Sequence, residues 1–254
     1  MNWHLIQHNK MKGQYNMDYD IELAYSCAAN NAYFRLYRWK PYCISLGANQ
    51  SFDDINLDKT KKDGLDIVKR PTGGRAILHA EELTYSVVIP ASAGYTPKEV
   101  YEKISIALLN GLSLYHPKLK RLCLENEQPN FPKLLSEPSG KLCFGSAAKN
   151  EIKYLGKKVV GSAQRKLSNV LLQHGSILCG NYHRKLVDYI HSDSDTRLDL
   201  SESTTELDFI IGERINYNEL QNSLIAGFEK EWNIKFPEIN SESVESIPTI
   251  KENF

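Results

Sequence analysis

The stretch KRPTGGRAILHAEELTYSVVIP, residues 69–90, places a Pro-Thr-Gly-Gly-Arg turn between two apolar runs that have the character of strands. Two adjacent glycines, Gly73 and Gly74, accept positive φ angles, so one interpretation is an ordinary hairpin turn. The other interpretation is that a backbone without side chains lets a ligand approach closely. The residues alone leave both interpretations open.

Charged side chains surround this glycine pair. Arg70 and Arg75 flank it, and His79 and Glu82 follow on the adjoining predicted strands. A polar crevice beside apolar strands suits an acyl chain with one polar end. The ligand interpretation therefore predicts an acyl-binding site at this turn.

Outward from the turn, β-branched and aromatic runs alternate with segments of helical periodicity. The predicted strands cover residues 2–8, 32–39, 43–49, 65–70, 75–79, 82–90, 150–155, 158–164 and 170–180. The predicted helices cover residues 15–30, 51–64, 97–115 and 183–190, with a last amphipathic helix after Asn216. Several strands are joined by short turns, which favours an α+β fold with a mixed, largely antiparallel sheet flanked by helices.

The predicted helix 15–30 has Ile21, Ala24, Tyr25 and Ala28 at helical spacing. Residues 117–141 contain four prolines and predict a long loop.

The length of 254 residues fits one catalytic domain over 1–254, with 191–254 as a helical extension and no separate accessory domain. Lys plus Arg and Asp plus Glu both number 31, so the basic excess of a dedicated nucleic-acid binder is missing. We expect a monomer that binds no nucleic acid.

Five cysteines without a CxxC pair predict reduced thiols. No signal segment begins the chain and no apolar run is long enough to cross a bilayer, so we expect a cytoplasmic protein without a membrane partner. His4 and His8 are spaced like zinc ligands, but they fall on a predicted strand without a third ligand. We therefore predict no metal site, and the sequence contains neither common glycine-rich phosphate motif.

Cys143 in SGKLCFGSAAKNEI is the candidate nucleophile, although a free cysteine is more often an inert core residue. The following hairpin brings Lys157 and Lys158, and alternation along the strand turns Lys158 inward. An ammonium near the thiol stabilises the thiolate. Gln173, His174 and Gly175 interrupt an apolar strand, and such polar groups either satisfy one another or face a ligand.

Four segments in this order, RPTGGRAILHAEELTYSVVI, CFGSAAKNEI, LGKKVVGSAQRK and LLQHGSIL, closely resemble the lipoate and octanoate protein ligase and transferase family. The likeness extends over residues 17–180. It implies a mixed sheet enclosing a tunnel for a medium-chain acyl group. The acyl-binding positions that it implies are Arg70, Gly73, Gly74, Arg75, His79, Gly161, Ser162, Ala163, His174 and Gly175.

The resemblance also implies the chemistry. Lys158 matches the lysine that the family places at the reacting carbonyl, and Cys143 matches the nucleophile of transferases with a Cys-Phe motif. Such transferases carry a proline and an aromatic residue where this chain has Ala147 and Asn150. The expected reaction moves octanoate from acyl carrier protein through a Cys143 thioester to a lysine of a lipoyl domain or glycine cleavage H protein.

Two alternatives remain beside the transferase. One is a lipoate-protein ligase, which would require ATP and Mg, whereas the transferase needs no cofactor because the thioester is already activated. The other is a non-catalytic module that binds acyl groups or lipoyl domains.

Overall fold

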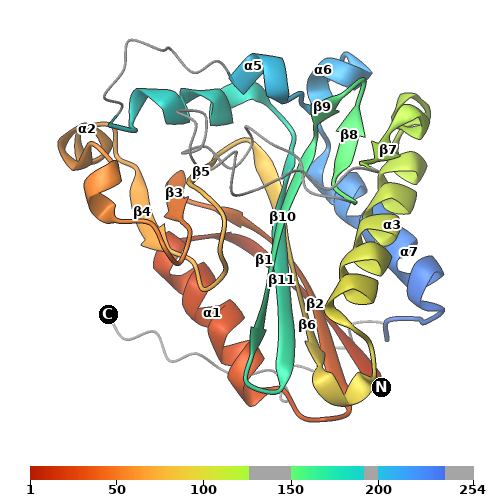
Figure 1. The fold of residues 1–254 in the computed structure, drawn as a ribbon. Helices are drawn as coiled ribbons and strands as arrows, with labels where there is room; N and C mark the ends of the chain where they lie inside the picture. Colours follow the sequence, from red (N-terminus) through yellow and green to blue (C-terminus); the bar gives the residue numbers. More distant parts are fainter. Residues whose placement is uncertain (126–149, 192–199, 238–254) are drawn as a thin grey trace.

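The structure is a computed structural model that describes residues 1–125, 150–191 and 200–237. Its main sheet has five strands in the order β1-β2-β6-β11-β10 (Figure 1). They are β1 (Asn2–Met11), β2 (Asn31–Trp39), β6 (Glu82–Pro90), β11 (Val170–Leu178) and β10 (Val160–Leu167). β1 and β2 run parallel, and the other three pairings are antiparallel. The predicted mixed, largely antiparallel sheet is confirmed.

Helices cover both faces of this sheet. On one face lie α3 (Pro97–Tyr115) and α7 (Tyr217–Trp232), which contact each other, and on the other face lies α1 (Gly13–Ser26) (Figure 1). Alternation along β6 separates the two cores: Tyr85 packs in the cluster of α3 and α7, whereas Val88 packs in the cluster of α1. Part of the predicted C-terminal extension, α7, therefore belongs to the core.

The buried face of α1 carries polar as well as apolar residues. Of the four residues noted in the sequence, Ala24 is buried, Ile21 is half-buried, and Tyr25 and Ala28 are exposed. The buried residues of α1 are Gly13, Asn16, Met17, Tyr19, Asp20, Leu23 and Ala24. Asn16 and Asp20 lie on this side because they accept hydrogen bonds from Arg35 of β2, and Asp20 also contacts His174 of β11.

A second sheet has the order β4-β3-β5, with β4 (Asp66–Lys69), β3 (Cys43–Leu46) and β5 (Ile77–His79). β3 lies between the other two, parallel to β4 and antiparallel to β5. The strands on either side of the glycine turn are therefore not paired with each other, and the hairpin interpretation of Gly73 and Gly74 is wrong.

The glycine turn, residues 70–75, instead crosses the end of β3. The amide of Arg70 donates to Leu46 O at 2.9 Å, and the amide of Ala48 donates to Thr72 O at 2.9 Å. Gly74 has φ +88°. Its carbonyl oxygen would lie 1.9 Å from a Cβ at position 47, so the two backbones touch where only Gly47 fits.

A small third sheet contains β7 (Cys123–Leu124), β8 (Ile152–Tyr154) and β9 (Lys157–Lys158). The predicted strand 158–164 is thus divided between β9 and β10. The turn from β8 to β9 consists of Leu155 and Gly156, with φ of 48° and 82°, one residue earlier than predicted. Within the predicted loop 117–141, the described part forms a 3₁₀ turn and β7.

Short helices complete the described chain. They are η1 (Phe52–Asp54), α2 (Leu57–Lys62), η2 (Ala91–Ala93), η3 (Pro117–Arg121), η6 (Asn181–Asp188), α5 (Leu200–Ser203) and α6 (Leu207–Ile211). The predicted helix at 183–190 is the 3₁₀ segment η6. No helix in the described ranges has the length and apolar content needed to cross a membrane.

Candidate active site

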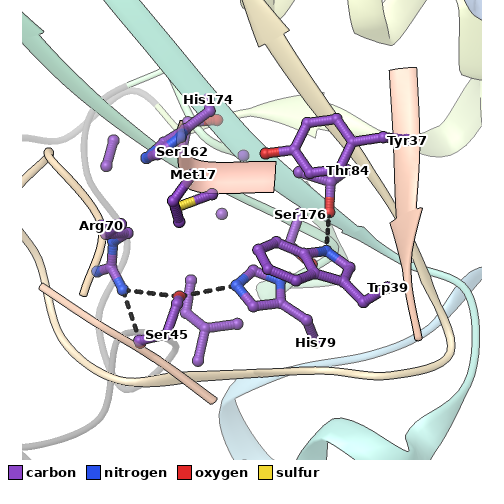
Figure 2. A pocket seen from close by; sticks show the side chains of 14 residues that line it. Met17, Tyr37, Trp39, Ser45, Arg70, His79, Thr84, Ser162, His174 and Ser176 are labelled. Carbon is purple, nitrogen blue, oxygen red and sulfur yellow. Dashed lines mark hydrogen bonds between the residues drawn. The ribbon is translucent and has the colours of Figure 1, made fainter. Parts of the chain in front are cut away.

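A cavity lies between the α1 side of the main sheet and the second sheet (Figure 2). Its empty volume is about 360 Å³, part of which opens to solvent. The lining residues are Met17, Tyr37, Trp39, Ser45, Arg70, Ile77, His79, Thr84, Gly161, Ser162, Ala163, His174, Gly175 and Ser176. An apolar part of the wall comes from Met17, Trp39 and Ile77, as an acyl chain would require.

His79 is held in the wall by partners on both ring nitrogens. Its Nδ1 lies 2.8 Å from Glu82 Oε1, and its Nε2 lies 2.7 Å from Ser45 Oγ. The ring also stacks on Trp39, with centroids 4.1 Å apart (Figure 2). Glu82 further accepts from Trp39 Nε1 at 3.0 Å and from the hydroxyls of Thr84 and Ser176. The buried carboxylate is therefore satisfied and orients the ring.

His174 has a matching environment on strand β11. Its Nδ1 lies 3.3 Å from Asp20 Oδ2, and its Nε2 lies 2.6 Å from Thr72 Oγ1. Burial lowers the pKa of His174, although Asp20 opposes the shift. Burial by itself would raise the pKa of Asp20, but Arg35 at 2.7 Å and hydrogen bonds from His174 and Ser86 outweigh it and lower the pKa to about 2.

The side chain of Arg70 binds backbone carbonyl groups of the glycine turn. Its guanidinium donates to Ser45 O at 2.9 Å, Gly73 O at 3.0 Å and Arg75 O at 2.6 Å. Arg70 itself lines the cavity, but Gly73, Gly74 and Arg75 are not among the lining residues. Arg70 is therefore the residue of the turn that lines the cavity, and the rest of the turn lies behind the wall.

Ser162 and Gly175 are paired across β10 and β11, next to Tyr85 on β6. The hydroxyl of Ser162 lies 2.6 Å from that of Tyr85. A Cβ at Gly175 would lie 2.6 Å from Tyr85 Cε1 and 2.5 Å from Gly161 O, so only glycine permits this contact. Burial raises the pKa of Tyr85 to about 12, which keeps the phenol protonated.

Lys158 is buried, as its predicted inward orientation requires. Its Nζ lies 2.8 Å from Glu151 Oε2, and both side chains are nearly inaccessible to solvent. Lys158 does not line the cavity, but it lies three positions before Gly161, which does line it. The geometry therefore places a buried Lys158–Glu151 ion pair at β9, directly before strand β10, which contributes to the cavity wall.

The structure thus brings together seven of the residues implied by the resemblance, namely Arg70, His79, Gly161, Ser162, Ala163, His174 and Gly175. Cys143 lies outside the described residues, as does Ala147. The roles of all these positions remain predictions.

Several residues in and behind the cavity wall were not singled out in the sequence. Met17, Trp39 and Ser45 line the cavity, whereas Asp20 and Thr72 do not line it but contact His174. One signal for Asp20 was available: with Asn16, Met17, Leu23 and Ala24 it forms a stripe at helical spacing on 13–26.

Within residues 1–125, 150–191 and 200–237, no cluster of three or more His, Cys, Asp or Glu side chains could hold a metal. His4 and His8 lie on β1, as predicted, and His8 Nδ1 accepts from Arg35 Nε at 3.1 Å. Burial, followed by the nearby Arg35 charge, lowers the pKa of His8 to about 4.

The protein is an α+β domain in which helices cover both faces of a mixed sheet. Its cavity is partly apolar, as suits an acyl group, and is lined by two histidines that each contact a carboxylate. The sequence matches the lipoyl protein ligase A/B catalytic domain over residues 12–229. The chain belongs to this family, and the predicted resemblance is confirmed.

Relatives and solved structures agree with this assignment. Octanoyltransferase LipM of Clostridioides difficile is 33% identical, over 93% of this chain and 89% of the relative. Octanoyltransferase LipM of Staphylococcus epidermidis is 30% identical, over 99% of this chain and 95% of the relative. A lipoate-protein ligase A bound with ATP shares the fold, with a TM-score of 0.73 and 23% identity over 97% of this chain and 92% of that chain.

Proposed function

We propose that this chain is an octanoyltransferase that moves an octanoyl group from acyl carrier protein to a lysine of a lipoyl domain or glycine cleavage H protein. The observation that carries the proposal is the match over nearly the whole chain to two proteins named octanoyltransferase. These relatives confirm the predicted acyltransferase class. The donor, the acceptor and the residue roles are our proposal.

The cavity supports an acyl substrate because Met17, Trp39 and Ile77 provide an apolar wall. A medium acyl chain gains roughly 0.8 kcal/mol for each methylene buried there. The thioester donor has a good leaving group, so no nucleotide is required for activation. We therefore propose that the reaction needs neither ATP nor Mg.

In this reaction the thiolate of Cys143 attacks the octanoyl thioester, and the thiolate of the carrier leaves. The amine of the acceptor lysine then attacks the acyl-Cys143 thioester, which forms the amide and releases Cys143. Lys158, a buried ammonium in its contact with Glu151, supports negative charge near the reacting carbonyl. The assignments of Cys143 and Lys158 rest on the sequence motifs.

The test supplies the purified chain and a lipoyl domain with either octanoyl acyl carrier protein or free octanoate, each with and without ATP and Mg. We expect octanoylation from the acyl carrier protein alone, at a rate that ATP leaves unchanged. Product formed only from free octanoate with ATP would establish the ligase instead. Binding of the lipoyl domain without product under all four conditions would establish the binding module.

A further inference from the structure

The two histidines of the cavity have the same pattern of partners. Each places Nδ1 against a buried carboxylate and Nε2 against a hydroxyl: Glu82 and Ser45 for His79, and Asp20 and Thr72 for His174. The hydrogen bonds of His79 connect residues of β3, β5 and β6. The hydrogen bonds of His174 connect helix α1, strand β11 and the glycine turn, three segments that are far apart in the sequence.

Asp20 determines which ring nitrogen of His174 carries the proton. This carboxylate is fully buried and accepts from Arg35 at 2.7 Å, Ser86 at 2.7 Å and Tyr37 at 3.0 Å. An anion so surrounded by donors accepts a fourth hydrogen bond from His174, which places the proton on Nδ1. Because burial disfavours the imidazolium form, Nε2 then carries a lone pair, and the hydroxyl of Thr72 donates to it.

Thr72 is the residue directly before Gly73, so its side chain positions the glycine turn. On one side its carbonyl oxygen accepts from Ala48 N at 2.9 Å, next to the end of β3. On the other side its hydroxyl reaches His174 in the main sheet at 2.6 Å. The turn is thereby held between the two sheets that enclose the cavity.

We propose that Asp20 is a positioning residue for acyl binding: it fixes His174 as a hydrogen-bond acceptor, and His174 in turn holds Thr72 and the glycine turn against the main sheet. The proposal deepens the octanoyltransferase function and rests on it for its kinetic consequence. Its structural part, the tautomer of His174, is independent of any activity.

The tautomer is measured by long-range ¹H–¹⁵N NMR of the histidine rings. In the wild type we expect His174 with a protonated Nδ1 and an unprotonated Nε2. In Asp20→Asn the one remaining oxygen stays with the donors Arg35 and Ser86, so the amide NH2 faces His174 Nδ1 and can only donate to it. The His174 signals therefore move toward the Nε2-protonated form, while those of His79 stay because Glu82 is intact. Asp18→Asn on the exposed side of the same helix is the matched control and leaves both rings unchanged.

Thr72→Val separates positioning from folding, because it keeps the shape of the side chain and removes only the hydroxyl. We expect KM for the octanoyl donor to rise roughly tenfold, since one buried hydrogen bond that holds the turn is lost, with kcat nearly unchanged. Thr72→Ser restores the wild-type KM. In Thr72→Val the His174 proton stays on Nδ1, because Asp20 and not Thr72 determines its place.

The proposal is overturned if Asp20→Asn, verified as folded by circular dichroism, leaves the His174 tautomer unchanged. It is also overturned if Thr72→Val moves the proton to Nε2, or if it lowers kcat with KM unchanged. Should the wild type prove to be a ligase, KM is measured for free octanoate in the ATP-dependent reaction. The positioning role is then decided separately from the choice of donor.

Discussion

At the scale of single residues, Asp20 is a buried carboxylate that joins helix α1 to strands β2, β6 and β11. Arg35 pairs with it at 2.7 Å, and the guanidinium of Arg35 lies 3.9 Å from the centre of the Tyr37 ring and 4.6 Å from that of Tyr19. Both charges are buried, and the cost of burying them is offset by further hydrogen bonds, which Arg35 donates to His8 and Asn16 and Asp20 accepts from Ser86 and Tyr37.

The pair makes stability depend on pH. The pKa of Asp20 falls from 3.8 to about 2 on folding, so the carboxylate stabilises the fold above the unfolded value, and this contribution is lost as the pH falls toward 2. We expect Asp20→Asn to lower the free energy of unfolding at pH 7 by about 2 kcal/mol or more. The slope of stability between pH 4 and pH 2 becomes shallower.

Urea denaturation at a series of pH values measures this effect. Asp18→Asn, on the exposed side of α1, is the control and keeps the wild-type slope. An Asp20→Asn variant whose unfolding free energy follows the wild-type curve across pH 4 to 2 contradicts the assignment.

Sequence reasoning identified Arg70 and His79 because they surround the glycine pair, and His174 because it interrupts an apolar strand, where a polar group needs a partner. It did not identify Asp20 and Thr72. Asp20 is one of several acidic residues on a helix, and its partners Arg35 and His174 are 15 and 154 positions away. Helical spacing places Asp20 on one stripe with Met17 and Leu23, but the stripe does not identify the distant partners that let a carboxylate be buried there.

At the scale of elements, the β8–β9 hairpin brings Glu151 and Lys158 together. Their ion pair closes the hairpin beside the cavity-lining strand β10. The sequence predicted a hairpin from its glycine and predicted the inward Lys158 from alternation. It did not predict the break at Val159, because the separation of β9 from β10 follows from their pairing with different neighbours.

The ion pair and the chemistry of Lys158 can be separated by a double variant. Lys158→Met leaves the buried Glu151 carboxylate without this ammonium, so we expect a loss of about 3–5 kcal/mol in stability together with slower transfer. Adding Glu151→Gln removes the uncompensated charge and restores most of the stability. If Lys158 acts on the reacting carbonyl, transfer stays slow in the double variant.

Thermal unfolding and single-turnover octanoylation are measured on the same preparations. Lys157→Met, on the exposed side of β9, is the control and keeps both properties near the wild type. Recovery of transfer in step with stability would show that Lys158 has only a structural role.

At the scale of the whole molecule, the sheet class and most strands follow from sequence patterns, but the pairing of strands does not. β4 and β5 flank the glycine turn as hairpin strands would, yet β3, more than 20 positions earlier, lies between them. The turn therefore spans a strand and joins the two sheets. This long-range arrangement places a common Gly-Gly pair behind the cavity wall, next to Arg70, which lines the cavity.

We propose that this cavity serves a covalent acyl transfer through Cys143. The most direct measurement is the intact mass of the purified chain after brief mixing with octanoyl acyl carrier protein, without nucleotide or acceptor. We predict the added mass of one octanoyl group, removed by hydroxylamine, present in Cys123→Ala and absent in Cys143→Ala. Octanoyl transfer to a lipoyl domain by Cys143→Ala at the wild-type rate would contradict the account.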